Sequence, residues 1–221
     1  MTLFNPNPKI LAVDLPGYKP CVVIDNFLLD PNSLVELACR QRANFSTPSR
    51  NAYPGIEWQM PDDFSARLND FFILHVRKLL GARRTVSMYS RLSMITLQPD
   101  ELAPNQRLCH QDQLSEDPQH CFGASVLYLF KNPALGGTSF YRPRADHVAS
   151  ANPNQPSAPS GYITDSNAEF EKFCTIPPLW NRIIFYDGTI FHSGHITQPG
   201  LLNSDPLSGR LTLNGFFTCR K

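Results

Sequence analysis

The feature that most constrains the fold is a change of hydrophobic periodicity near Gly81. Before it, residues 30–45 and 62–81 carry the apolar spacing of amphipathic helices, and Gly81 is placed to end the second one. After it, short β-prone runs follow one another with no helical pattern between them. The strand candidates are 21–28 and then 85–97, 124–130, 138–141, 182–186 and 210–217. This order predicts a mainly β jelly-roll or barrel with flanking α-helices packed outside.

The chain is expected to form a single domain over residues 1–221. A hydrophobic content of 42% supports one well-packed core, and neither a repeat nor a break in composition divides the sequence. Residues 1–20 are expected to be an irregular lead-in. Residues 143–172 are rich in Pro, Ser and Asn and form a long loop inserted between core strands. A flexible surface loop and an active-site lid both remain open for this segment.

Charge and cysteine usage exclude several classes of protein. Lys plus Arg number 20 and Asp plus Glu 19, so the basic bias of a nucleic-acid surface is absent. The sequence has no apolar run of about 18 residues, which a membrane helix would need. The six cysteines are scattered without a CxxC pair, which argues against a zinc ribbon. Because the start lacks a signal-peptide pattern, we expect a cytoplasmic protein with reduced thiols.

A candidate metal site begins with the segment CHQDQ at residues 109–113. On a strand, His110 and Asp112 would share one face, because side chains alternate with a period of two. One imidazole and one carboxylate, joined by a second imidazole, would form the facial triad that leaves positions open on Fe(II). An HxD pair alone is weak evidence, since most such pairs bind no metal.

The third ligand is sought in YDGTIFHSGHI, residues 186–196. His192 and His195 are three residues apart, so in an extended segment they face opposite ways. His192 follows the apolar pair Ile190–Phe191 at the end of a strand-like run, whereas His195 lies beyond a glycine and is expected to face solvent or a second layer. His192 is the preferred ligand, with His195 as the alternative.

The segment GRLTLNGFF, residues 209–217, adds a polar stripe. On a strand, Arg210, Thr212 and Asn214 share one face, and the apolar Leu211 and Leu213 share the other. A buried arginine needs an anionic partner, and its planar guanidinium can bind a carboxylate as a fork. The alternative is an ordinary edge strand with its polar face in solvent.

Taken in order, these motifs resemble the 2-oxoglutarate/Fe(II)-dependent dioxygenase superfamily. More narrowly, the chain is similar to a little-characterised bacterial family of that superfamily, over about residues 20 to 219. The landmarks are Tyr53–Gly55, His110–Asp112, Gly136–Arg142, Asn181–Arg182, His192–Gly194 and Gly209–Phe217. The resemblance implies a double-stranded β-helix, the cupin-like form of the jelly roll.

The resemblance also implies roles for individual residues. His110, Asp112 and His192 match the metal ligands, and Arg210 matches the residue that binds the distal carboxylate of 2-oxoglutarate. Thr212, Asn214 and Tyr128 are expected beside that carboxylate; for Tyr128 a core aromatic is the alternative. Gly136 and Gly137 match a structural turn at a strand entry. One departure is the gap of 18 positions from His192 to Arg210, whose extra residues must loop out.

The implied activity is that of an iron enzyme. With Fe(II), O2 and 2-oxoglutarate as co-substrate, it would hydroxylate a C–H bond and release succinate and CO2. Asp112 favours hydroxylation over halogenation, because related halogenases lack this carboxylate. The alternatives are a non-catalytic, cupin-like metal- or ligand-binding protein and a β-sandwich with no site.

A small-molecule substrate is expected, because the chain carries no appended recognition domain. Candidate pocket residues are Tyr53, Trp58, Arg91, Arg142 and the 143–172 loop. The two arginines favour an anionic or amino-acid-like substrate, unless they are ordinary surface or salt-bridged arginines.

Overall fold

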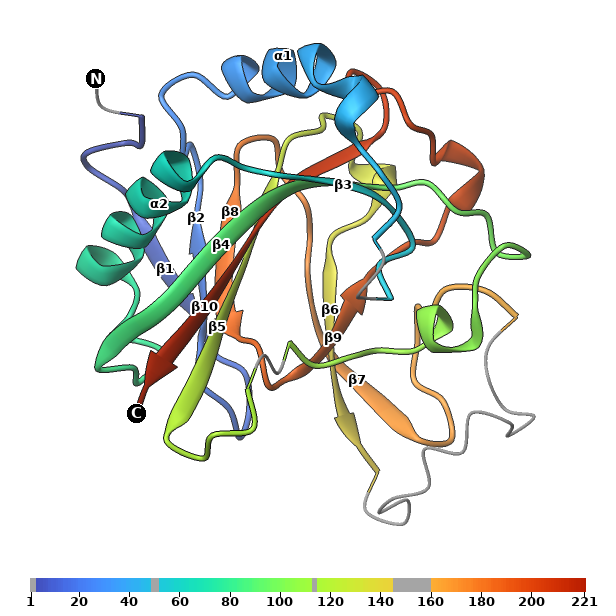
Figure 1. Ribbon diagram of the computed structural model, residues 1–221. Coiled ribbons are helices and arrows are strands. Elements are labelled where there is room, and N and C mark those ends of the chain that lie inside the picture. Colours follow the sequence, from blue (N-terminus) through green and yellow to red (C-terminus); the bar gives the residue numbers. More distant parts are fainter. Residues whose placement is uncertain (1–2, 49–51, 113–114, 145–159) are drawn as a thin grey trace.

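Two antiparallel sheets and two α-helices make up the part of the chain that the computed structural model describes, residues 3–48, 52–112, 115–144 and 160–221 (Figure 1). The large sheet has the order β1 (Ile10–Val13), β2 (Cys21–Ile24), β8 (Ile183–Asp187), β5 (His120–Tyr128), β10 (Arg210–Arg220), β4 (Arg84–Ile95) and β3 (Gly55–Gln59). The small sheet has the order β7 (Phe170–Ile176), β6 (Thr138–Pro143) and β9 (Phe191–Gly194).

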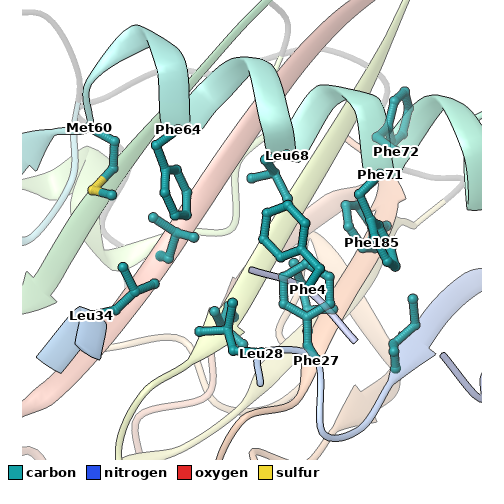
Figure 2. Close-up of a cluster of buried hydrophobic side chains, with 14 of the residues drawn as sticks. Phe4, Phe27, Leu28, Leu34, Met60, Phe64, Leu68, Phe71, Phe72 and Phe185 are labelled. Carbon is teal, nitrogen blue, oxygen red and sulfur yellow. The ribbon is translucent and has the colours of Figure 1, made fainter. Parts of the chain in front are cut away.

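The outer face of the large sheet is covered by α1 (Asn32–Arg40) and α2 (Asp62–His75) (Figure 1). Apolar side chains of α2 meet those of the sheet and the N-terminal segment in one aromatic-rich core (Figure 2). The Phe72 ring stacks on the Phe217 ring at 4.0 Å between centroids, which ties α2 to β10. Burying each such side chain contributes about 1.5–3 kcal/mol, so this face is the main source of stability.

A second core fills the space between the two sheets. The Phe140 ring of β6 meets the Tyr186 ring of β8 edge-on, with 5.1 Å between centroids. Tyr128 of β5 and Ile176 of β7 belong to the same buried cluster. Two facing antiparallel sheets with helices outside confirm the mainly β, double-stranded β-helix fold that the sequence predicts.

β10 lies in the centre of the large sheet and separates the two cores. It pairs with β4 on one side and β5 on the other. Its side chains alternate as the sequence predicts: Leu211 and Leu213 enter the helix-covered core, whereas Arg210 and Thr212 line a pocket between the sheets. The edge-strand alternative for this segment is therefore wrong.

The structure corrects several expected boundaries. The supposed irregular lead-in contains β1, an edge strand whose Leu11 side chain is exposed, so no buried face marks it in the sequence. β3 lies between the two expected helices, where none of the strand candidates falls. A Cβ on Gly55 would lie 2.0 Å from the Met94 carbonyl oxygen, so the glycine permits strand contact here instead of signalling a turn. α2 ends at His75, and turns continue to Gly81, which has a φ of 72°.

The long loop predicted over residues 143–172 is only partly described. Residues 145–159 lie outside the described residues, which leaves the choice between lid and surface loop untested. At its far end, β7 already begins at Phe170, and Tyr162 is buried with its hydroxyl donating to the Leu97 carbonyl at 2.7 Å. All six cysteines are free. No helix among the described residues is long and apolar enough to cross a membrane.

Candidate active site

His110, Asp112 and His192 converge at one end of the pocket. Their potential ligand atoms all lie within 4.8 Å of one another. The two oxygens of Asp112 face one histidine each: Oδ2 lies 3.2 Å from His192 Nε2, and Oδ1 lies 3.6 Å from His110 Nε2. Ligands bound at about 2.0–2.2 Å to one ion and at right angles are separated by about 3 Å. The three residues therefore fit a single metal ion after small side-chain adjustments.

Backbone pairing brings the HxD segment to His192. His110 and His192 exchange two backbone hydrogen bonds, of 3.0 and 2.9 Å, as an isolated antiparallel bridge at the edge of the small sheet. The Asp112 amide then donates to the Gly188 carbonyl at 2.7 Å. The strand expected for CHQDQ is thus reduced to one bridge, and Gln113 lies outside the described residues. A Cβ on Gly188 would approach the Asp112 Cβ to 3.1 Å, so a small residue is needed there.

The environment of His192 leaves one ring nitrogen for a metal. Its Nδ1 lies 2.8 Å from the Ile190 carbonyl oxygen, which fixes the ring so that Nε2 faces Asp112. Burial alone would lower the pKa of His192, but the Asp112 carboxylate and the Ile190 carbonyl outweigh it and raise this pKa. A metal bound at Nε2 would compete with a proton for that atom.

The other two residues carry the charges that a divalent ion needs. Burial opposes ionisation of Asp112, yet His192, His110 and Arg91 together hold the pKa of Asp112 below its usual value. The His110 ring faces the open pocket, with 59% of its side-chain surface accessible. Partial desolvation in the pocket, and then the charge of His192, lower the pKa of His110 below its ordinary value. A neutral His110 and an ionised Asp112 at neutral pH suit metal coordination.

Arg210 occupies the other end of the pocket and is buried. Its Nε donates to the carbonyls of Leu135 and Gly136 at 3.0 and 3.1 Å, and its Nη2 donates to the Gly137 carbonyl at 2.9 Å. Within the described residues the guanidinium has no carboxylate partner within ion-pair distance. A buried charge held only by neutral carbonyls is costly, so this arrangement favours an anionic ligand.

The three carbonyls form a cradle, defined by residues 135–137, that depends on glycine. Gly136 has a φ of 82°, and a Cβ there would lie 1.9 Å from the His195 carbonyl oxygen. A Cβ on Gly137 would lie 2.0 Å from the Ile176 carbonyl oxygen. The glycines expected to be a structural turn therefore also orient Arg210. Sequence reasoning missed this second role, because only the folded loop brings their carbonyls to the arginine.

Between the two ends, the pocket wall is polar on β10 and β4. Thr212 donates to the Ser93 carbonyl at 3.3 Å, and its hydroxyl also bonds the side chain of Tyr53. Asn214 is buried, and its Oδ1 has no hydrogen-bond partner within the described residues. The hollow measures about 540 Å³ including its open mouth. An unsatisfied amide oxygen in such a pocket indicates a place for a ligand or an ordered water.

Several predicted residues lie elsewhere. His195 is outside the metal cluster, and its Nδ1 lies 3.1 Å from the Ser139 hydroxyl. Tyr128 is fully buried, with its hydroxyl 2.8 Å from that of Thr138, which does line the pocket. Trp58 packs against the helix-covered core. Arg142 forms a half-exposed ion pair with Glu171 at 3.0 Å. Trp58 and Arg142 are thus wrong as pocket residues, whereas Tyr53 and Arg91 do line it.

The excursion between His192 and Arg210 does not displace the arginine. Residues 195–209 leave β9 and include a short 3-10 helix at Pro199–Leu201 before β10 begins. A Cβ on Gly194 would lie 3.6 Å from Arg210 Nη2, so the guanidinium ends beside β9, two residues after His192. Two strand residues span about 6–7 Å, which is comparable to the length of a five-carbon dicarboxylate.

Comparisons with known proteins place this architecture. A family model described as "Family of unknown function (DUF6445)" matches residues 6–217. No curated protein matches the chain. A prolyl-4-hydroxylase from Pseudomonas putida is similar in structure, with a TM-score of 0.50 and 18% identity over 94% of this chain and 96% of that one.

Two enzymes of nogalamycin biosynthesis are also similar in structure. The non-heme alpha ketoglutarate dependent epimerase SnoN has a TM-score of 0.50 and 12% identity, over 90% of this chain and 78% of that one. The carbocyclase SnoK, of the same cofactor dependence, has a TM-score of 0.50 and 13% identity, over 90% and 79%. At these identities the likeness concerns the fold, which is that of oxygenases with a double-stranded β-helix core.

Proposed function

Since the chain belongs to the DUF6445 family, whose description assigns no function, we propose its activity from the site: an Fe(II)- and 2-oxoglutarate-dependent oxygenase that hydroxylates a C–H bond of a small molecule. One observation carries the proposal. A buried guanidinium without a carboxylate partner in the described structure lies beside β9, two residues from the histidine of a two-histidine, one-carboxylate cluster. A metal at one end and a free cation at the other fit a short dicarboxylate between them.

Each residue has a role in this proposal. His110, Asp112 and His192 would hold Fe(II) and, as only three protein ligands, would leave room on the metal for the co-substrate and O2. The metal supplies the activation of O2 and the oxidation of the C–H bond. Arg210 binds the distal carboxylate of 2-oxoglutarate as a fork, oriented by the 135–137 cradle.

The remaining polar groups complete the co-substrate site. Thr212 offers its hydroxyl beside Arg210, and Asn214 offers its amide nearer the metal. Tyr128 stays a prediction as a direct ligand, because its hydroxyl reaches the pocket wall through Thr138. The overall reaction is R–H + O2 + 2-oxoglutarate → R–OH + succinate + CO2. Two structural neighbours are enzymes of nogalamycin biosynthesis, which supports a small molecule as R–H.

The test is succinate formation from 2-oxoglutarate by the full chain with Fe(II) and ascorbate, followed together with O2 uptake. Some turnover is expected even without the substrate, because co-substrate oxidation can run uncoupled. Asp112→Ala is expected to lose both bound iron and succinate formation. Asp165→Ala is the matched control, because that carboxylate is exposed, and its contacts are an ion pair with Lys172 and a hydrogen bond from the adjacent Ser166 amide.

Two outcomes would contradict the proposal. Succinate formation that persists at the parent rate in Asp112→Ala would show that the cluster is not the catalytic metal site. Stable metal binding without succinate formation from 2-oxoglutarate, across a panel of candidate substrates, would favour the alternative of a non-catalytic cupin-like binding protein.

A further inference from the structure

The pocket contains a second arginine at a different level from Arg210. Arg91 projects from β4 and lines the same pocket, with 9% of its surface exposed. In the register of β4 and β10, Arg210 lies opposite Ile95 and Asn214 lies opposite Arg91. The two arginines therefore start four strand residues apart, about 13 Å along the sheet.

Strand register places Arg91 toward the metal end of the pocket. Its guanidinium packs on the Phe216 ring, and Phe216 pairs with Ala124 of β5, which in turn pairs with Tyr186 of β8. The Tyr186 ring meets the His192 ring edge-on, with 4.8 Å between centroids. Arg91 is thus the cation nearer the metal cluster, on the side of the pocket away from the 135–137 cradle.

The Arg91 guanidinium is positioned by two aromatic rings and one carboxylate. Its carbon lies 4.7 Å from the centre of the Phe216 ring and 5.4 Å from that of the Tyr53 ring. Its Nη1 lies 2.5 Å from Glu57 Oε2. Its Nε is buried and has no hydrogen-bond partner within the described residues. The ion pair with Glu57 therefore leaves at least the Nε donor of the guanidinium unsatisfied within the described residues.

The co-substrate does not account for this group. In the proposed function, one carboxylate of 2-oxoglutarate chelates the metal and the other binds Arg210, so both are engaged. Phe216 lines the Arg91 side of the pocket with an apolar ring, and this ring is held by stacking on Tyr89 at 4.9 Å between centroids. Cation and ring together suit an organic acid with an apolar body.

We propose that Arg91 binds a carboxylate of the substrate to be oxidised, and that the substrate is an organic acid whose apolar part lies along Phe216. This inference rests on the proposed function, because it assumes that 2-oxoglutarate occupies the Arg210 end. A free amino acid and an acid without an ammonium group share this chemistry, and the experiment separates them.

The probe is 3-phenylpropanoate, titrated by calorimetry into the full chain loaded with Mn(II), which cannot drive turnover, and with saturating 2-oxoglutarate. The neutral isostere 3-phenylpropanamide is the ligand control, and it is expected to bind at least tenfold more weakly. L-Phenylalanine has the same skeleton with an ammonium group. Tighter binding of L-phenylalanine than of 3-phenylpropanoate indicates an amino-acid substrate, and weaker binding indicates a plain acid.

Three variants test the residue. Arg91→Gln is expected to weaken 3-phenylpropanoate binding at least tenfold, with a much smaller change in the affinity for 2-oxoglutarate. Glu57→Gln, which keeps the cation and removes its competing carboxylate, is expected to strengthen binding of the probe. It also covers the case in which Arg91→Gln fails to fold. Arg142→Gln removes a half-exposed arginine paired with Glu171 and is expected to change nothing.

The results that overturn the inference are distinct from those that overturn the proposed function. If Mn(II) and 2-oxoglutarate do not bind, both fail. If they bind and the acid binds no more tightly than its amide, the inference alone fails. It also fails if Glu57→Gln leaves binding of the acid unchanged or weaker, or if a folded Arg91→Gln binds the acid like the parent protein.

Discussion

The two faces of β10 differ in almost every property except their backbone. Leu211, Leu213 and Phe217 are completely buried against the helix-covered core. Arg210 and Thr212, each directly next to one of these leucines in the sequence, face the pocket, where Arg210 donates hydrogen bonds to neutral carbonyls. Both faces share one set of hydrogen bonds to β4 and β5. The outer face therefore stabilises the fold, and the inner face carries the unsatisfied groups that a ligand would complete.

The largest effect is expected from Arg210→Gln. Removing one partner of a buried charged pair costs about 2–5 kcal/mol of binding, so the KM for 2-oxoglutarate should rise at least about 30-fold. The free energy of unfolding without ligand should change far less, because the guanidinium is then buried without a carboxylate. Steady-state kinetics and urea unfolding measure the two quantities. A loss of unfolding free energy as large as the loss of binding free energy would contradict the assignment of binding, and not stability, to the inner face of β10.

Leu213→Ala, on the other face of β10, is expected to have the opposite effect: a large loss of stability and little change in binding. Truncating a fully buried leucine should lower the free energy of unfolding by about 2–5 kcal/mol, because the side chain leaves a cavity under α2. The affinity of the remaining folded protein for 2-oxoglutarate should stay at the parent value. Urea unfolding and calorimetric titration at low temperature check this pair of results. A large loss of affinity in folded protein would show that the outer face shapes the site.

Gly136→Ala is expected to affect both stability and binding. The positive φ alone costs about 1–3 kcal/mol for a residue with a side chain, and the new Cβ also meets the His195 carbonyl. Because the Gly136 carbonyl helps to orient Arg210, binding of 2-oxoglutarate should weaken as well. Gly200→Ala is a suitable control, since a Cβ there meets nothing within 4 Å. Unchanged 2-oxoglutarate binding in folded Gly136→Ala would show that the 135–137 cradle does not orient Arg210 for this ligand.

The smallest effect is expected from Thr212→Val. The substitution keeps the shape and removes one hydroxyl, which is worth about 0.5–1.5 kcal/mol. The KM for 2-oxoglutarate should therefore rise by roughly threefold to tenfold. An unchanged KM would mean that the hydroxyl serves only the Ser93 carbonyl and Tyr53.

The sequence predicted the architecture and the polar face of β10 because both depend on periodicity. It also selected the three residues that the structure brings together, although the metal role of His110, Asp112 and His192 stays a prediction. The strand expected for His110 and Asp112 is a single bridge. The cluster forms because backbone bonds to His192 and Gly188 position the segment, and no pattern in the sequence records those pairings.

Residues that depend on three-dimensional neighbours could not be predicted. The 135–137 cradle requires the turn after β5 to fold back on β10. Tyr128 points into the space between the sheets, as an inward residue should, but Thr138 stands between it and the pocket. Trp58 and Arg142 lie in or beside the Tyr53–Gly55 and Gly136–Arg142 landmarks, and their side chains are of types that often bind ligands. Only the packing shows that they face away from the site.

The most direct test of the central claim is a calorimetric titration of 2-oxoglutarate into the full chain, with and without Mn(II). If one pocket holds the metal and the dicarboxylate together, 2-oxoglutarate should bind much more tightly when Mn(II) is present. Arg210→Gln and Asp112→Ala should each abolish this gain. Equal affinity with and without metal, or a gain that survives Asp112→Ala, would contradict the account.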